Sequence, residues 1–427
     1  MSPVSITTES DAFEADIELS EYESSDPFEL SEPAARMLTQ EVNGGDARDG
    51  ERIKLRYNRD GDAILTATQY VGVVSLRDGP TIQIQPKAAG TNLLYLLRYA
   101  QNTTATTFES ETPFRRGQTF LDAFGALYEA ELRRVLNRGL QTDYQRVHSS
   151  EKRLRGQIDL QRQLQRQPPT PTEFECTYDE LTHDTTVNRA ILYATSVLLG
   201  AVSDRSIAQA LRQHQQSLRR RVTLTPVTVE AVNAIQLNRL SEHYEDILRL
   251  ARLVIGNSFI GELEAGSSAS FAMLVNMNTV FENAVERAFR TVVEERDGWR
   301  VEPQERTQSL LTGGKHQVTL KPDVTVYDDS NRVRLIVDAK WKTDAPSNAD
   351  FYQMTSYMLA HDAPGLLAYP DCDGTNATKA EVAGQYSLTL TELSTAVDCA
   401  DANEFIRQFE DEIRDVLKTS TLARATR

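Results

Sequence analysis

The sequence predicts an α/β protein of the α+β multidomain kind, with a β-rich and helical N-terminal region and a C-terminal α/β domain. Three observations support this fold class. The length of 427 residues is enough for about three domains. The first part of residues 51–118 shows short strand patterns separated by turn residues, and residues 119–262 show mainly helical periodicity. Helix and strand patterns then alternate over 268–427.

Residues 1–50 form an acidic segment, with ten acidic residues by position 32 and no basic residue before Arg36. Such a composition cannot bury enough apolar surface to order itself, so we expect a disordered tail. The alternative is a docking arm, or a decoy for DNA.

The whole chain has a net charge of −16 and uses far more arginine than lysine, a composition that resembles proteins of salt-loving organisms. At about 1 M salt the Debye length is about 3 Å, so this charge does not exclude a nucleic-acid substrate.

The three cysteines form no disulfide framework or zinc pattern. The longest uncharged run, Ala190–Ser203, is shorter than the roughly 20 residues of a membrane span. We therefore expect a cytoplasmic protein without a membrane segment.

The β-rich domain, residues 51–118, begins with four predicted strands that alternate in polarity. Turn residues at 58–62 and 77–80 separate them, which predicts a small antiparallel unit. The predicted strands are Ile53–Tyr57, Ala63–Ala67, Tyr70–Leu76 and Thr81–Gln85.

Helices are predicted at Leu93–Ala100, Thr119–Leu140 and Ala190–Val202, the last with Asp184 or a neighbouring threonine as its N-cap. Residues 132–166 contain nine basic residues and three acidic ones. This segment is either a surface that faces phosphates or a partner, or the solvated face of a helix.

Residues 321–342, KPDVTVYDDSNRVRLIVDAKWK, predict a β-hairpin with polar chemistry at one end. Two β-rich runs flank the turn residues 328–331. Side chains two apart share a face of a strand, so Asp338 and Lys340 point the same way and Asp323 can lie across from them. Four of the nine lysines in the chain fall within 315–342. The alternative is an ordinary hairpin with polar residues on its exposed face.

Two carboxylates and one ammonium around one point suit Mg²⁺ and a phosphate, because Mg²⁺ prefers one or two carboxylates together with water and phosphate oxygens. Asp323 and Asp338 are the candidate metal ligands. Lys340 would orient the attacking water or neutralise the developing charge.

This pattern resembles the PD-(D/E)-x-K nuclease superfamily, and the text DAKWK is similar to the McrC family, nuclease subunits of McrBC modified-cytosine restriction systems. Further resemblances are carried by Tyr70, Val71, Gly72, Pro86, Lys87, Gly139, Leu140, Tyr144 and Leu154-Arg155-Gly156. The resemblance implies a restriction-endonuclease-like α/β domain at 268–427, cleavage of DNA, and an AAA+ GTPase partner that binds the GTP and docks on the N-terminal half.

The resemblance also implies roles for three residues outside the hairpin. Glu282, on the predicted first helix of the nuclease domain, would lean toward the metal, although Thr279 and Glu282 also fit a capping box. Gln353 and Tyr357, neighbours on a helix at Ala349–Ala360, would orient Lys340 or bind a DNA phosphate. A plain surface pair is the alternative.

Gly313-Gly314-Lys315-His316 lacks the spacing of a Walker A motif, so we do not expect the chain to be its own motor. Two classes of function compete: a Mg²⁺-dependent DNA endonuclease subunit, and a non-catalytic adaptor that only stimulates the GTPase. A stand-alone DNA-repair nuclease is a third hypothesis.

Overall fold

The computed structural model describes residues 16–44, 50–86, 90–100, 119–166, 172–239, 241–260, 271–304, 319–342, 346–371, 378–395, 399 and 402–421. Lys87, the segment Gly313–His316 and the expected domain start near Ser268 lie outside these ranges. The chain divides into two compact units. The first unit consists of Met1–Phe124 together with Asn257–Arg427, and the second unit is Gly125–Gly256.

The first unit contains a five-stranded sheet whose strand order is β1-β5-β4-β10-β9. Strand β1 pairs in parallel with β5, and the other neighbours are antiparallel. Its strands are β1 (Ile17–Ser20), β4 (Tyr70–Ser75), β5 (Thr81–Gln85), β9 (Ser258–Ile260) and β10 (Phe271–Asn276). A separate hairpin joins β2 (Ile53–Tyr57) to β3 (Ala63–Ala67). The four strands expected at 53–85 therefore form, within one residue of the predicted ends.

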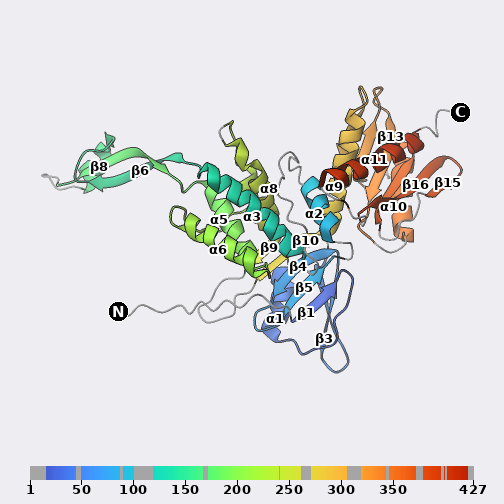
Figure 1. Ribbon diagram of the computed structural model, residues 1–427, viewed down its shortest axis with the longest axis horizontal. Coiled ribbons are helices and arrows are strands. Elements are labelled where there is room, and N and C mark those ends of the chain that lie inside the picture. The colour runs from blue at the N-terminus through green and yellow to red at the C-terminus, as the bar shows by residue number, and fades with distance from the viewer. Residues whose placement is uncertain are drawn as a thin grey trace. The chain divides into compact units, whose positions relative to one another are not determined.

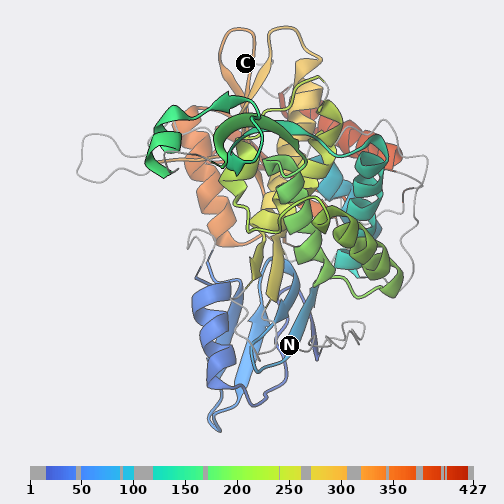
Figure 2. The same ribbon diagram turned by 90° about the vertical axis from the view of Figure 1, so that its left-hand side faces the viewer.

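Residues 16–44 are ordered, which corrects the expectation of a disordered tail for this stretch. After β1, helix α1 (Glu32–Arg36) continues into the π-helix η1 (Met37–Val42), and both lie beside the sheet (Figure 2). Leu19, Met37 and Leu38 are buried in one core with sheet residues. The acidic composition made these few apolar positions easy to overlook. Their burial is sufficient to order the segment once it can pack against a sheet.

Gly72 shows why β10 can lie against β4. Its φ of 149° is rarely adopted by other residues, and a Cβ here would lie 1.9 Å from the carbonyl oxygen of Met273. Only glycine permits this approach of the two backbones.

The same unit contains a six-stranded mixed sheet of order β11-β12-β13-β14-β16-β15. Its strands are β11 (Arg300–Pro303), β12 (Val324–Tyr327), β13 (Val333–Ala339), β14 (Gly365–Asp371), β15 (Thr378–Val382) and β16 (Tyr386–Ser394). Its helices are α9 (Met277–Glu294), α10 (Asn348–His361) and α11 (Ala402–Thr421). Helices α9 and α11 pack together and contact β13, and α10 packs on β13 and β14.

The contacts between elements do not follow the expected domain boundary between residues 51–118 and residues 268–427. Strand β10 belongs to the N-terminal sheet and runs directly into α9, because it pairs along its length with β4. Helix α2 (Gly90–Ala100) packs against α9 and α11. The Tyr99 hydroxyl donates a hydrogen bond to Glu410 at 2.6 Å. The two sheets therefore share one compact unit.

The second unit combines helices with an exposed three-stranded sheet of order β6-β8-β7. Its elements include α3 (Phe120–Arg138, which begins in the first unit), β6 (Asp143–Glu151), β7 (Gln157–Ile158), α4 (Leu160–Arg166), β8 (Phe174–Thr182), α5 (Thr186–Leu199), α6 (Arg205–Arg219), α7 (Val229–Asn233), the 3-10 helix η3 (Glu242–Tyr244) and α8 (Glu245–Gly256). The helical region expected at 119–262 is interrupted by strands at 143–151 and 174–182, where β6 and β8 pair over nine residues. Figure 1 shows these strands extending away from α5 and α6.

None of the helices in the described part of the chain has the length and apolarity of a membrane span.

Candidate functional site

The hairpin predicted at 321–342 forms, with β12 and β13 as antiparallel neighbours. Its turn is stabilised by Asp328, whose carboxylate accepts hydrogen bonds from the backbone N–H groups of Ser330 and Arg332. Asn331 occupies the left-handed region, with a φ of 61° that asparagine tolerates. The turn residues thus set the register that brings the two acidic ends of the strands together.

Asp323 lies immediately before β12 and reaches across to β13. Its Oδ2 accepts a hydrogen bond from the backbone N–H of Ala339 at 2.8 Å. Ala339 stands between Asp338 and Lys340, and the Nζ of Lys340 lies 2.7 Å from Oδ2 of Asp338. The structure therefore brings the three predicted hairpin residues together.

Burial and mutual repulsion dominate the electrostatics of this cluster. Burial, and then the charges of Asp338 and Glu282, raise the pKa of Asp323 well above its usual value. Burial also raises the pKa of Asp338, against the opposing effect of the Lys340 ammonium. Burial alone would lower the pKa of Lys340, but the negative charge of Asp338 raises it. A cation between the carboxylates would relieve their repulsion.

The donor set fits Mg²⁺. The Oδ2 atom of Asp338 is buried, and the Lys340 ammonium that lies 2.7 Å from it leaves the charge of the neighbouring Asp323 unbalanced. Among the residues that the structure describes, no group of three or more His, Cys, Asp or Glu side chains could hold a metal ion. Two carboxylates with water and phosphate oxygens suffice for Mg²⁺, whereas a site built from protein ligands alone does not form here.

Glu282 lies within α9 and is half-buried. The N-cap of α9 is Asn276, whose side chain accepts from the N–H groups of Asn278 and Thr279, so the capping box starting at Thr279 is wrong. The helix begins earlier because Asn276 ends β10 and caps the helix directly. Glu282 is close enough for its charge to raise the pKa of Asp323, but it joins no three-ligand metal group among the described residues.

Gln353 and Tyr357 meet on α10, as expected for residues four apart. The Gln353 amide donates to the Tyr357 hydroxyl at 3.0 Å, and this hydroxyl donates to the carbonyl oxygen of Lys321 at 3.1 Å. Tyr357 therefore secures the chain two residues before Asp323. Its hydrogen bonds go to Gln353 and Lys321 rather than to Lys340, and Gln353 is exposed.

A second lysine of the motif, Lys342, was not assigned a role from the sequence. Its ammonium lies 2.8 and 3.1 Å from the two carboxylate oxygens of Asp350, which is buried at the start of α10. Asp350 also completes a capping box with Ser347. The unusual retention of lysine at 315–342 was the signal that could have identified this pair.

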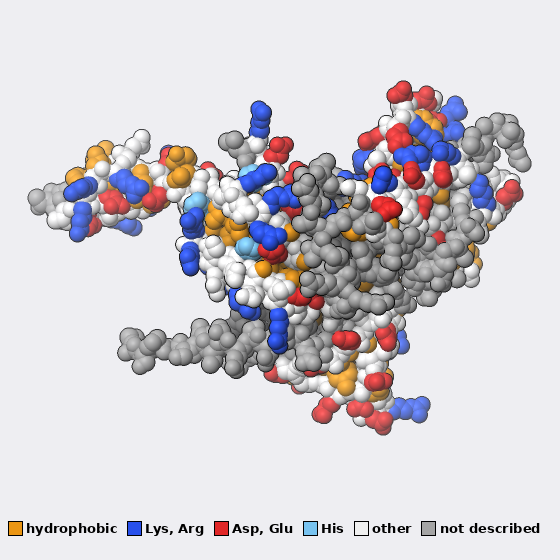
Figure 3. Space-filling view, in the orientation of Figure 1, with side chains coloured by type: hydrophobic (Ala, Val, Ile, Leu, Met, Phe, Trp, Pro, Cys, Tyr) orange, Lys and Arg blue, Asp and Glu red, His pale blue; other side chains and the backbone are white. Residues whose placement is uncertain are grey.

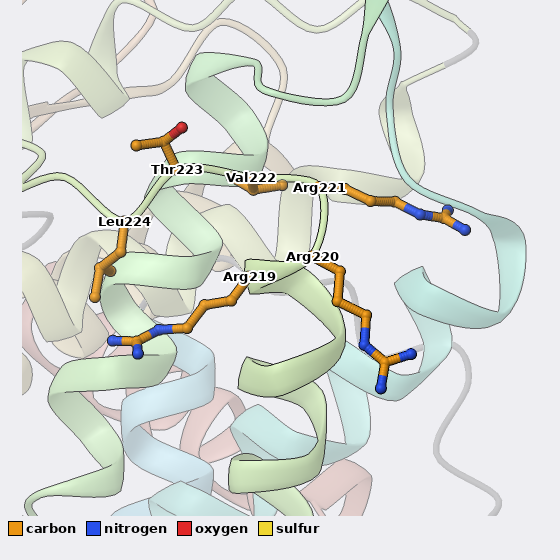
Figure 4. Close-up of a pocket in the computed structure, with 6 residues that line it drawn as sticks. All are labelled: Arg219, Arg220, Arg221, Val222, Thr223 and Leu224. Atoms are coloured by element: carbon orange, nitrogen blue, oxygen red, sulfur yellow. The ribbon is translucent and has the colours of Figure 1, made fainter. Parts of the chain in front are cut away.

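A hollow in the second unit is lined by Arg219, Arg220, Arg221, Val222, Thr223 and Leu224. Figure 4 shows the three arginine side chains pointing in different directions. The arginines do not converge, and none of the six lining residues is a carboxylate, a histidine or a cysteine, so we assign no catalytic role to this hollow.

The exposed sheet of the second unit carries both basic and large apolar side chains. Figure 3 shows hydrophobic and basic atoms side by side on this sheet. The exposed apolar residues on or beside it are Tyr144, Leu154, Ile158, Leu160, Leu164, Phe174 and Leu181. Residues 143–151 and 157–158 form the strands β6 and β7, so the helix-face alternative is wrong for them. Exposed apolar residues gathered in this way are typical of a binding surface.

Comparison with solved structures finds this fold in a chain of the refined half-complex from the tetradecameric assembly of Thermococcus gammatolerans McrB AAA+ hexamers with bound McrC. The TM-score is 0.61 and the identity 17%, over 94% of this chain and 99% of the other. A chain of the Thermococcus gammatolerans McrBC complex matches at 19% identity and a TM-score of 0.44, over 64% of this chain and 86% of the other. No curated protein is significantly similar to this chain.

The family model of the McrBC 5-methylcytosine restriction system component matches residues 65–370. This range is more than half of the 427 residues and includes the strands β4 and β5 and the hairpin of β12 and β13. The chain belongs to the McrBC 5-methylcytosine restriction system component family.

Proposed function

We propose that this chain is the Mg²⁺-dependent DNA endonuclease subunit of a modification-dependent restriction system in the cytoplasm. The observation that carries the proposal is the pair of the half-buried Asp323 and the buried Asp338 beside Lys340. Burying two carboxylates that repel each other is costly unless a cation neutralises them. An adaptor without catalysis has no need of this arrangement.

The residues divide the work of phosphodiester hydrolysis between them. Asp323 and Asp338 would hold Mg²⁺, which when bound activates water and screens negative charge. Lys340, paired with Asp338 in the structure, would place its positive charge against a phosphate oxygen. Water attacks phosphorus, the bond to the leaving oxygen breaks, and that oxygen takes up a proton. Tyr357 holds the strand that carries Asp323 through the Lys321 carbonyl.

We also propose an AAA+ GTPase as partner, which binds the GTP. The similar fold comes from an assembly of McrB AAA+ hexamers with bound McrC. On this chain, the exposed apolar residues of the β6-β8-β7 sheet provide a surface for a partner. Partner contact also suits the charge of −16, because such a chain alone neutralises few DNA phosphates.

The test is cleavage of modified plasmid DNA by the full chain with its cognate AAA+ GTPase, GTP and Mg²⁺. Asp338→Asn or Lys340→Ala should reduce cleavage by at least about 100-fold, since each removes a charge that acts on the transition state. Stimulation of GTP turnover should stay within about twofold of wild type, because neither change touches the second unit.

Asp329→Asn at the exposed hairpin turn is the matched control and should cut normally. Near wild-type cleavage by Asp338→Asn would contradict the assigned site. Absence of cleavage by the wild-type complex, with GTPase stimulation intact, would favour the adaptor. Rapid degradation of linear DNA by the chain without a partner would favour the repair nuclease.

A further inference from the structure

Glu21, from the acidic N-terminal stretch, lies behind the candidate nuclease site. Its side chain is fully buried, and the indole N–H of Trp341 donates to its two carboxylate oxygens at 2.9 and 3.2 Å. Trp341 directly follows Lys340 and is itself buried. A residue of the N-terminal sheet region therefore contacts the strand end that carries the catalytic lysine.

The backbone around Glu21 directs its side chain. Glu21 follows β1, and its N–H donates to the carbonyl oxygen of Gln85 at 3.1 Å, which extends the pairing with β5. The next residue, Tyr22, turns the chain with a φ of 62°. The carboxylate thus extends from the edge strand of the five-stranded sheet, held by main-chain bonds.

Trp341 passes this constraint to a second element of the site. Its ring packs against Phe281, with centroids 5.6 Å apart and planes at 58°. Phe281 is fully buried on α9 beside Glu282. One buried indole therefore lies between the strand end with Lys340 and the helix with Glu282.

A buried carboxylate is a costly way to hold a tryptophan, since apolar residues of similar volume often stabilise a core equally well. The advantage of the carboxylate is that its hydrogen bond is directional. The bond fixes the rotation of the indole ring, whereas apolar packing leaves the ring more freedom.

We propose that Glu21 is a positioning residue of the nuclease site: by fixing the Trp341 indole it aligns Lys340 with the carboxylates, and it makes that alignment depend on the N-terminal sheet. This inference rests on the proposed function. Glu21 touches no reacting atom and acts on the site through Trp341.

The experiment uses the full chain with its GTPase partner, and compares Glu21→Leu with Glu21→Gln. Leucine fills the space without an acceptor, and glutamine keeps one acceptor oxygen. Glu21→Leu should lower kcat for cleavage at least tenfold with KM for DNA within twofold, because the DNA-binding surface is unchanged. Glu21→Gln should recover to within threefold of wild type. Glu18→Leu, on the exposed side of β1, removes the same charge and should match wild type.

A spectroscopic measurement follows the indole without relying on cleavage. The chain has two tryptophans, Trp299 and Trp341, so Trp299→Phe leaves Trp341 as the single fluorophore. In this background Glu21→Leu should shift the Trp341 emission and raise its rotational mobility, measured by anisotropy decay, whereas Glu21→Gln should leave both near wild type. Trp341→Phe combined with Glu21→Leu should be no worse in kcat than either alone, since the two act as a unit.

Each result decides one question. Wild-type kcat in Glu21→Leu, equal losses for leucine and glutamine, or losses that follow melting temperature across the variants would overturn the positioning role. If the wild-type complex does not cleave, the proposed function fails and the positioning role fails with it. If wild type cleaves and only the Glu21 comparison fails, the proposed function stands.

Discussion

Asp323 accepts a hydrogen bond from the backbone N–H of Ala339, the residue between Asp338 and Lys340. This bond extends the pairing between the start of β12 and the end of β13, in the register that the turn and the strand pairs set. A shift of one residue would turn Asp338 and Lys340 to the other face of the sheet, so the register decides whether a site exists.

The buried aspartates predict how Mg²⁺ stabilisation depends on pH. A carboxyl whose folded pKa is raised binds its proton more tightly in the folded state, so its contribution to stability is present at low pH and is lost as pH rises through the folded pKa. Asp323→Asn should therefore gain stability relative to wild type as pH rises from about 4 to 8 in metal-free buffer. In wild type, Mg²⁺ should raise the melting temperature more at pH 8 than at pH 5.

Thermal melts with EDTA or with Mg²⁺ at both pH values measure this effect. Asp329→Asn, at the exposed turn, should retain the wild-type pH profile. An equal Mg²⁺ effect at both pH values would show that the metal binds elsewhere.

The pair Lys342 and Asp350 predicts a stability cost at α10. Lys342→Met leaves a buried carboxylate with only its Ser347 bonds and should cost about 1–3 kcal/mol, reduced by solvent because the lysine is 39% exposed. Adding Asp350→Asn should recover much of this loss. Hydrogen exchange of α10 and urea unfolding measure the change.

Lys418→Met is the matched control, since its partner Asp415 is on the surface, and it should change stability by less than about 0.5 kcal/mol. Equal effects of Lys342→Met and Lys418→Met would contradict a specific role for the buried pair.

The shared sheet predicts which fragments fold. A fragment of residues 1–261 lacks β10, so its five-stranded sheet loses the strand between β4 and β9, and the fragment should show only the thermal transition of the unit at 125–256. A fragment of residues 125–256 contains one compact unit and should melt cooperatively. Circular dichroism melts of both fragments measure this, and a second cooperative transition in residues 1–261, absent from residues 125–256, would show that β10 is dispensable.

Asp184 predicts a pH-dependent contribution to the second unit. Asp184 lies just before α5, whose N-cap is Thr185. Its carboxylate accepts two hydrogen bonds at 2.7 Å from the Arg189 side chain, and two more from the backbone N–H and the hydroxyl of Thr223. The Arg189 hydrogen bonds hold the pKa of Asp184 well below its usual value. The stability from a lowered pKa is present above the unfolded value, about 4, and is lost progressively as pH falls.

Asp184→Asn should therefore cost about 1–3 kcal/mol at pH 7, and the difference from wild type should shrink below about pH 4. Chemical unfolding of residues 125–256 at several pH values measures it. Asp179→Asn, in an exposed pair with Arg146, should have little effect at any pH. A cost that stays constant down to pH 2 would contradict a charge-dependent network.

Helices and strands were predictable from the sequence where the element has a clear apolar period of its own. The strands at 53–85, the hairpin turn and the helix at 348–361 follow from alternation, turn residues and apolar spacing. The shared direction of Asp338 and Lys340 follows from the two-residue period of a strand.

Pairing between distant segments was not predictable in this way. Strand β10 could equally have begun the C-terminal domain, because its apolar run of five residues does not say which sheet receives it. The ordered residues 16–44 escaped prediction because their acids outnumber the few side chains that enter the core.

The sequence by itself determined the chemistry of the site: an aspartate before one strand, and an aspartate and a lysine two apart at the end of the next. Only the tertiary structure decided what surrounds these groups. Trp341 and Glu21 are 320 positions apart and meet because β1 joins the N-terminal sheet, a sheet completed by β10 as it leads into α9. Periodicity is a property of neighbours along the chain, whereas this contact depends on which buried surfaces find each other when the two sheets form one unit.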